Sequence, residues 1–196
     1  MSHDRESTNP IGAIASLLGR PFQLDLRSLA LFRVGMGVLL ISDLINRATW
    51  LRAHYTDWGV MPRKALLDTL WDRAWLSVHL FSGTFWPTAL LFVLAGIAAV
   101  AMLIGWRTRI ATVVSWFLLI SVQARNPMVL QGGDIVFRVL LFWSIFLPIG
   151  ARWSVDAALA NILPPDASDE EAEPGHNRVL SPATVALVAQ MCFIYV

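Results

Sequence analysis

Apolar residues gather into long runs along this chain, and shorter polar stretches separate the runs. Four runs predict membrane-spanning helices, and a fifth begins at Ser181-Pro182 and reaches Val196 after fifteen residues. A complete crossing needs about twenty apolar residues, so flanking residues must extend the short third and fourth runs. The pattern predicts an all-α fold, a multi-pass transmembrane helical bundle of four spans plus a truncated fifth. The four complete spans are 28–46, 86–105, 110–124 and 135–149.

The longest polar section between the runs covers residues 47–86. Within it, apolar residues recur at three- and four-residue spacing, which is typical of an amphipathic helix. We expect this helix to lie at the membrane interface or against the bundle. Its apolar positions are Leu66, Leu67, Leu70, Trp71, Trp75, Val78 and His79.

The remaining polar stretches suggest how the domain is bounded. Residues 1–27 are expected to form an N-terminal arm or interfacial segment, since their apolar run is short for a signal peptide. Residues 28–196 form the transmembrane domain, and the acidic stretch within 160–180 predicts a flexible exposed loop. Because the last apolar run stops after fifteen residues, we expect the chain to be a fragment of a longer protein.

Composition supports the membrane class and excludes several others. The chain is 56% hydrophobic and only 15% charged, with a mean hydropathy of +0.59. A net charge of +1 gives no electrostatic case for nucleic acid. One cysteine excludes an internal disulfide, and no spacing suggests a metal site. The nine tryptophans fit rings placed at the boundary between water and lipid.

A few charged residues fall inside or beside the predicted spans: Arg33, Asp43, Asp134 and Arg138. Asn126-Pro127 should end one helix, and Asp134 can cap the next, with Arg138 four residues later on the same face. We hypothesise that Asp43 and Arg138 pair across the bundle and that Asp134 is a second acceptor. The alternatives are a well-capped turn of no special function and charges that reach the headgroups separately.

The positive charges in the loops only weakly indicate how the chain is oriented in the membrane. Arg107 and Arg109 in a tight loop favour the cytoplasm, so the N-terminus is expected to be cytoplasmic as well. Residues 47–86 and the turn at 125–134 then lie outside. The expected location is the cell membrane, that is the inner or plasma membrane, with the lipid bilayer as first partner.

Candidate chemistry is limited to a few side chains in the outer segments. Arg125, Asp134, Arg138 and His54 are the candidates for a catalytic role, because they lie on one predicted side. Trp58 and His79 are candidates for contact with a cofactor. For both histidines a structural role is the alternative, and for the tryptophans an interface belt is the alternative.

Several segments taken in order resemble one family, the HTTM domain, a bacterial relative of the vitamin K-dependent γ-glutamyl carboxylases. The resemblance extends over nearly the whole chain from Arg27 onward. The segments are Leu31-Phe32-Arg33-Val34-Gly35 with Asp43, Tyr55-Thr56-Asp57-Trp58-Gly59-Val60-Met61-Pro62-Arg63, Asn126-Pro127 with Gly132-Gly133-Asp134, and Arg152-Trp153-Ser154-Val155-Asp156.

The resemblance implies a reduced quinone of the vitamin K type as cofactor and a peptide as substrate. It also implies a lysine base in the turn that corresponds to residues 125–134, but the chain has its only lysine at Lys64. Arginine cannot replace that base, because a guanidinium does not release its proton near neutral pH. Carboxylation therefore does not carry over. An enzyme related to the carboxylases and a non-catalytic membrane scaffold or lipid- or quinone-binding module both stay open.

Overall fold

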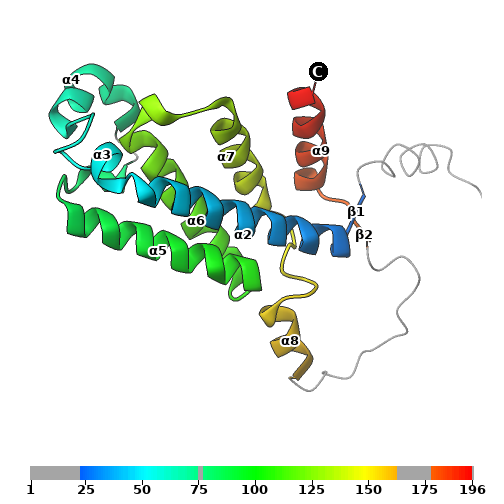
Figure 1. The fold of residues 1–196 in the computed structure, drawn as a ribbon. Helices are drawn as coiled ribbons and strands as arrows, with labels where there is room; N and C mark the ends of the chain where they lie inside the picture. The colour runs from blue at the N-terminus through cyan, green and yellow to red at the C-terminus, as the bar shows by residue number, and fades with distance from the viewer. Residues whose placement is uncertain (1–22, 75–76, 163–177, 196) are drawn as a thin grey trace, which may run out of the picture.

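The computed structural model describes residues 23–74, 77–162 and 178–195, and within them the chain is mostly helical (Figure 1). The predicted N-terminal arm and acidic loop fall largely on residues outside these ranges. Eight α-helices occur in the described part. They are α2 (Leu26–Thr49), α3 (Leu51–Tyr55), α4 (Arg63–Ala74), α5 (Phe85–Ile104), α6 (Thr108–Arg125), α7 (Gly132–Ser144), α8 (Val155–Ile162) and α9 (Pro182–Tyr195).

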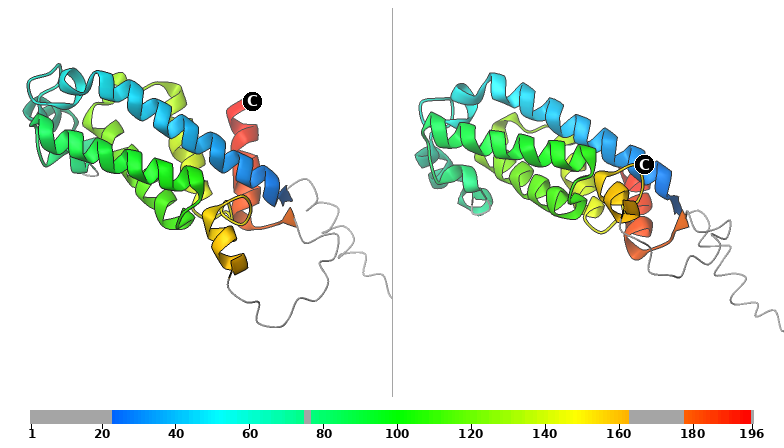
Figure 2. Two further views of the ribbon diagram at one scale, coloured as in Figure 1. Left: turned by 60° about the horizontal axis from the view of Figure 1, so that its bottom comes forward. Right: turned by 90° about the horizontal axis from the view of Figure 1, so that it is seen from below.

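Three long helices, α2, α5 and α6, lie side by side as the body of the bundle (Figure 2). The tight connection between α5 and α6 makes these two helices antiparallel neighbours. α7 packs on α6, and α9 packs on α7. A two-stranded ribbon, β1 (Leu24–Asp25) with β2 (Arg178–Val179), joins the start of α2 to the segment before α9.

α2 and α5 approach closely at one glycine. A Cβ atom added to Gly37 would lie 2.9 Å from Cβ and 3.0 Å from Cα of Leu103, so only glycine fits there. Gly35, two residues earlier, has nothing within 4 Å of such an atom. Of these two glycines, only Gly37 is therefore at the contact between α2 and α5.

Two helices in the described part, α2 and α5, are long and apolar enough to cross a membrane. Four spans are not supported. α6 has 18 residues but carries two arginines and several hydroxyl side chains, which lower its hydropathy. The predicted fourth span is wrong in extent, because α7 ends at Ser144 after 13 residues, or about 20 Å.

The predicted amphipathic helix is also shorter than the apolar pattern, which continues to His79. α4 ends at Ala74, and a separate 3-10 turn, η2 (Val78–Leu80), carries His79 into the interior. Leu66 is buried on α4 and Leu67 is exposed, so an inward face exists. The side chains of Trp71 and Trp75 lie outside the described residues.

Polar side chains are buried in the bundle, while many apolar side chains face outward. Buried polar residues include Arg33, Arg47, His79, Gln123 and Arg125. The apolar core lies between α2, α5, α6, α7 and α9. Only 33% of the most apolar window of each long helix, α2 and α5, is buried. This distribution differs from that of a core helix in a soluble protein, which is mostly buried.

Candidate functional site

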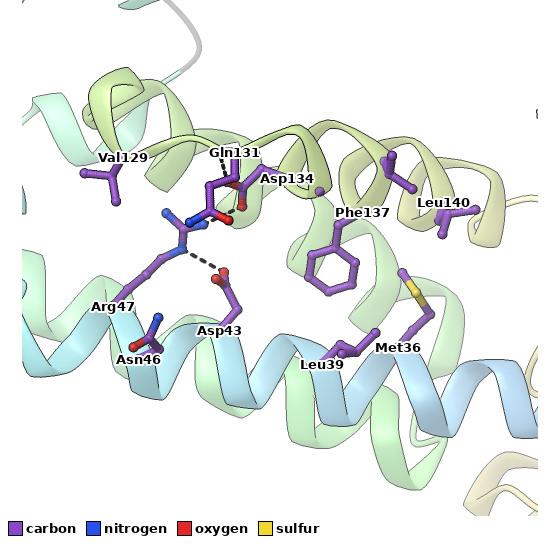
Figure 3. Close-up of a pocket in the computed structure, with 12 residues that line it drawn as sticks. Met36, Leu39, Asp43, Asn46, Arg47, Val129, Gln131, Asp134, Phe137 and Leu140 are labelled. Atoms are coloured by element: carbon purple, nitrogen blue, oxygen red, sulfur yellow. Dashed lines mark hydrogen bonds and ion pairs between the residues drawn. The ribbon is translucent and has the colours of Figure 1, made fainter. Parts of the chain in front are cut away.

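A pocket of about 500 Å³ lies between α2 and the segment that leads into α7 (Figure 3). One end is charged and the other is apolar. The charged end holds Asp43, Arg47 and Asp134, with Asn46 and Gln131 at its edge. The apolar end holds Met36, Leu39, Phe137 and Leu140. Val129, Gly133 and Val136 complete the lining.

Arg47 is the centre of the charged end, and each nitrogen of its guanidinium donates to a different residue. Nε donates to Asp43 Oδ2 at 2.8 Å, and Nη2 donates to Asp134 Oδ1 at 2.6 Å. Nη1 donates to the hydroxyl of Tyr55 at 3.0 Å. With 7% of its side chain exposed, Arg47 ties α2, α3 and α7 together.

Local sequence places each of these groups. Asp43 and Arg47 are four residues apart on α2, so they share one helix face. Asp134 is in the first turn of α7, where its Oδ2 accepts the backbone N–H of Gln131 at 2.8 Å in a capping box. The prediction that Asp134 caps the helix that follows it is wrong in position: α7 begins at Gly132, its N-cap residue is Gln131, and Asp134 supplies the N3 half of the capping box. Tyr55 is buried on α3 with its ring edge against Phe92.

Two carboxylates share one guanidinium, so the formal charge of this end is −1. Among the described residues, Asp43 Oδ1 has no hydrogen-bond partner, although Oδ2 is held by Arg47. The side chain of Asp43 is 23% exposed and that of Asp134 is 13% exposed. Burial raises the pKa of Tyr55 and the nearby charge of Arg47 offsets part of that rise, so the phenol stays protonated. The site therefore offers a free acceptor beside an apolar wall.

The predicted pair of Asp43 with Arg138 is wrong, and so is a pair of Asp134 with Arg138. Arg47 is the partner of both carboxylates. Arg138 is half-buried, does not line the pocket, and has no ion-pair partner among the described residues. The physical reason is that α2 extends to Thr49, which brings Arg47 onto the helix and closer to Asp43.

Arg125, a predicted site residue, belongs to a separate cluster at the same end of the bundle. It is fully buried, donates to the carbonyl of Met61 at 2.9 Å, and pairs with Asp57 at 3.4 Å. Asp57 also pairs with Arg63 at 2.8 Å. Burial alone would raise the pKa of Asp57, but its hydrogen bonds with Arg63 lower it overall. A Cβ atom on Gly83 would collide with the Asp57 carboxylate, so the 77–84 segment is fixed against this cluster.

His79 and His54 are not in contact with the pocket between α2 and α7. His79 is 1% exposed, its Nδ1 lies 2.7 Å from Ser121 Oγ, and its Nε2 is buried with no hydrogen-bond partner in the described ranges. Burial, with a smaller contribution from the charge of Arg125, lowers the pKa of His79 to about 4. The carbonyl of His54 accepts from Asn126 Nδ2 at 3.0 Å. The described residues contain no group of three potential metal-ligating His, Cys, Asp or Glu side chains.

Arg33 lies toward the opposite end of α2 from Asp43. It is buried and donates to the carbonyls of Ile149 and Trp153 at 3.3 and 2.6 Å. Nearby, the Asp156 carboxylate accepts the backbone N–H groups of Arg107 and Thr108 and so caps α6. This part of the Arg152–Asp156 motif is structural.

Trp58 does not line the pocket, since its side chain is 86% exposed on the loop after α3. Arg47 and Tyr55 are the site residues that sequence reasoning missed. The four-residue spacing of Asp43 and Arg47 was the available signal for Arg47, but the predicted span stopped at Asn46. No sequence signal places Tyr55 against Arg47.

No family model, curated protein or solved structure matches this chain. The resemblance to the HTTM domain stays a prediction. Function is therefore inferred from the pocket, from the surface of the bundle and from that resemblance.

Proposed function

We propose that this chain is an integral membrane protein with α2 and α5 in the bilayer, and that it binds a neutral amphipathic ligand of the quinol type in the pocket between α2 and α7. It acts as a binding module, and the ligand's apolar tail leaves toward lipid. The observation that carries the ligand assignment is Asp43 Oδ1, which lies at the head of an apolar-walled pocket and has no hydrogen-bond partner in the part of the chain that the structure describes.

The surface of α5 supports the membrane placement. Its outward side chains form an apolar face, with Leu90, Val93, Ile97 and Val100 each 46–59% exposed. Trp86 and Trp106 stand at the two ends of this face and are also exposed. From Trp86 to the end of α5 at Ile104 the helix rises about 27 Å at 1.5 Å per residue, which is close to the roughly 30 Å thickness of the hydrocarbon core. Tryptophan is enriched at those two boundaries.

The distribution of charge supports the same placement and an orientation. Arg27, Arg107 and Arg109 are exposed at one end of the bundle, and that end is proposed to face the cytoplasm. Arg47, which sequence alone assigns to an outer loop, is buried in α2 and no longer counts as a loop charge. Intramembrane charges are costly unless they are paired, and Arg47 has two carboxylate partners.

A quinol fits both halves of the pocket. Its hydroxyl groups donate hydrogen bonds, and Asp43 Oδ1 accepts them. The ring and tail match the side chains of Leu39 and Phe137. The charge of −1 at the head of the pocket disfavours anionic ligands. A bound quinol would supply an oxidisable ring, and the chain's own residues orient it through Asp43 and exclude water through Phe137.

Binding rather than carboxylation is proposed because the base is missing. The only lysine, Lys64, is exposed on α4 and does not line the pocket. The resemblance to the HTTM domain supports a quinone-type ligand. It does not supply a group in this pocket that corresponds to the lysine of the carboxylases.

The test is a binding measurement on the full chain in lipid nanodiscs. Decylubiquinol and its oxidised form, decylubiquinone, are titrated separately, and intrinsic tryptophan fluorescence reports binding. We expect the quinol to bind more tightly than the quinone, because the quinone carries no donor for Asp43. Asp43→Asn should bring the two affinities together, since an amide both donates and accepts.

Two neighbouring residues on α7 provide a test variant and its matched control. Phe137 lines the pocket and Arg138 does not. Phe137→Ala should weaken quinol binding about tenfold, which corresponds to roughly 1.4 kcal/mol, while Arg138→Ala should leave it unchanged. Absence of binding by the unmodified protein would overturn the proposal, and so would an equal loss in both variants.

A further inference from the structure

A second concave surface lies between α5 and α6, and it differs from the pocket in being almost wholly apolar. Its volume is about 560 Å³. Leu94 and Ile97 from α5 face Val114 and Phe117 from α6 across it. All four are 39–59% exposed, so the groove is an outward-facing surface of the bundle.

One end of this groove is cationic. Trp106 and Arg107, in the short connection between α5 and α6, line that end. The backbone N–H of Arg107 donates to Asp156 Oδ1 at 2.7 Å, which fixes the main chain there. The guanidinium itself is exposed and has no carboxylate within ion-pair distance in the described part of the chain. It is an exposed positive charge at the mouth of an apolar groove, with the Asp156 carboxylate bound to the backbone of the same residue.

The groove lies within the depth of one leaflet. Its lining residues run from Leu94 to Ala101 on α5 and from Ile110 to Leu118 on α6, which are rises of about 10 and 12 Å at 1.5 Å per residue. Half of the roughly 30 Å hydrocarbon core is about 15 Å. From the cationic end of the bundle the groove therefore reaches most of the way to the proposed middle of the membrane.

We infer that the groove between α5 and α6 binds one acyl chain of an anionic phospholipid, whose phosphate pairs with Arg107. The inference rests on the proposed membrane placement and is independent of the quinol pocket. Charge complementarity selects the occupant, because an exposed arginine beside a tryptophan at the interface recognises an anionic headgroup. A neutral apolar partner would offer the exposed guanidinium no phosphate to pair with.

Native mass spectrometry of the purified full chain tests the inference with two defined lipids. Dioleoyl phosphatidylglycerol is anionic, and dioleoyl phosphatidylcholine has the same chains with a zwitterionic headgroup. One interfacial arginine contributes about 1 kcal/mol toward anionic lipid, so phosphatidylglycerol should bind about fivefold more tightly. Arg107→Gln should remove that difference. Val114→Trp should fill the groove and weaken both lipids.

Arg109 is the matched control, because it is exposed two residues later and does not line the groove. Arg109→Gln should change the phosphatidylglycerol affinity less than twofold. Equal affinity of the unmodified chain for the two lipids would overturn the inference, as would the same loss in both arginine variants. Full displacement of phosphatidylglycerol by glycerol 3-phosphate would also overturn it, since that would be a headgroup site without the groove.

Three further outcomes separate this inference from neighbouring ones. A dimer that Val114→Trp dissociates would show that a second copy, and not lipid, covers the groove, and would overturn the inference. Loss of the lipid preference in Arg107→Gln while decylubiquinol still binds would support the inference and show that the two sites are separate. Recovery of the chain outside the membrane fraction would instead remove the membrane placement on which both proposals rest.

Discussion

Arg47 Nη2 and Asp134 Oδ1 lie 2.6 Å apart, although 87 residues separate them in the chain. This contact fixes the end of α2 against the start of α7 and so sets the width of the pocket between them. Asp43 and Tyr55 bind the same guanidinium. A single arginine therefore orders the polar end of the proposed ligand site.

Replacing Arg47 should destabilise the bundle strongly. Arg47→Gln leaves Asp43 and Asp134 close together with no cation between them. Removal of one partner from a buried ion pair costs about 3 kcal/mol. The free energy of unfolding, measured by titration with sodium dodecyl sulfate in mixed micelles, should fall by that order. Arg52→Gln, at an exposed position on α3, should leave it nearly unchanged.

The two glycines of α2 should respond in opposite ways to alanine. Gly37→Ala would place a methyl group against the backbone and side chain of Leu103, so α2 and α5 must separate. Overpacking of this kind costs about 1–3 kcal/mol. Gly35→Ala meets open space and should be neutral or stabilising by up to about 1 kcal/mol, through helix propensity. Similar melting temperatures for the two variants would contradict the packing of α2 on α5.

Acid should weaken the fold through His79. Its pKa is about 4 in the folded protein and 6.5 in an ordinary environment, so the unfolded chain takes up the proton first. The contribution of neutral His79 is complete above pH 6.5 and is lost as the pH falls toward 4, by about 3 kcal/mol in total. Measurements of unfolding between pH 7 and pH 4 should show this slope. His79→Gln should flatten it, and His54→Gln should keep it.

Asp156 should stabilise the start of α6. Burial alone would raise its pKa, but hydrogen bonds from Thr108 and Arg107 and the charge of Arg33 lower it overall. Because folding favours the charged carboxylate, Asp156 adds to the free energy of unfolding above pH 3.8. That stabilisation is lost as the pH falls below this value. Asp156→Ala removes the cap and should cost about 1 kcal/mol. Asp68→Ala, at an exposed position on α4, is the control, and equal losses would refute the capping role.

Labelling of intact cells should place the two ends of α2 and α5 on opposite sides of the membrane. In a Cys192→Ser background, Arg52→Cys and Arg109→Cys each provide one exposed thiol at an opposite end of the bundle. A membrane-impermeant maleimide should modify the cysteine at position 52 in intact cells. It should modify the cysteine at position 109 only after lysis. Labelling of both in intact cells would contradict the proposed orientation.

Much of the fold follows from local pattern. The apolar run around residues 86–105 predicts α5 almost to the residue, because a helix with no charge and a proline in its first turn has few alternatives. The end of α6 at Arg125 follows from Asn126-Pro127, since proline excludes the helical conformation of its predecessor. The number of membrane spans depends less on local sequence. Runs 110–124 and 135–149 are apolar on average, yet α6 buries polar side chains and α7 ends at Ser144.

The sequence by itself determined the helical class and the position of α5, because each depends on neighbours within a few positions. Tertiary structure decided the partners of the charges. Asp43 binds Arg47 and not Arg138, and Asp134 joins them from α7. Composition and periodicity give the depth of a charge along its own helix. The direction in which that side chain points across the bundle depends on where the helix ends and how its neighbours pack, and one added turn of α2 was enough to change the pair.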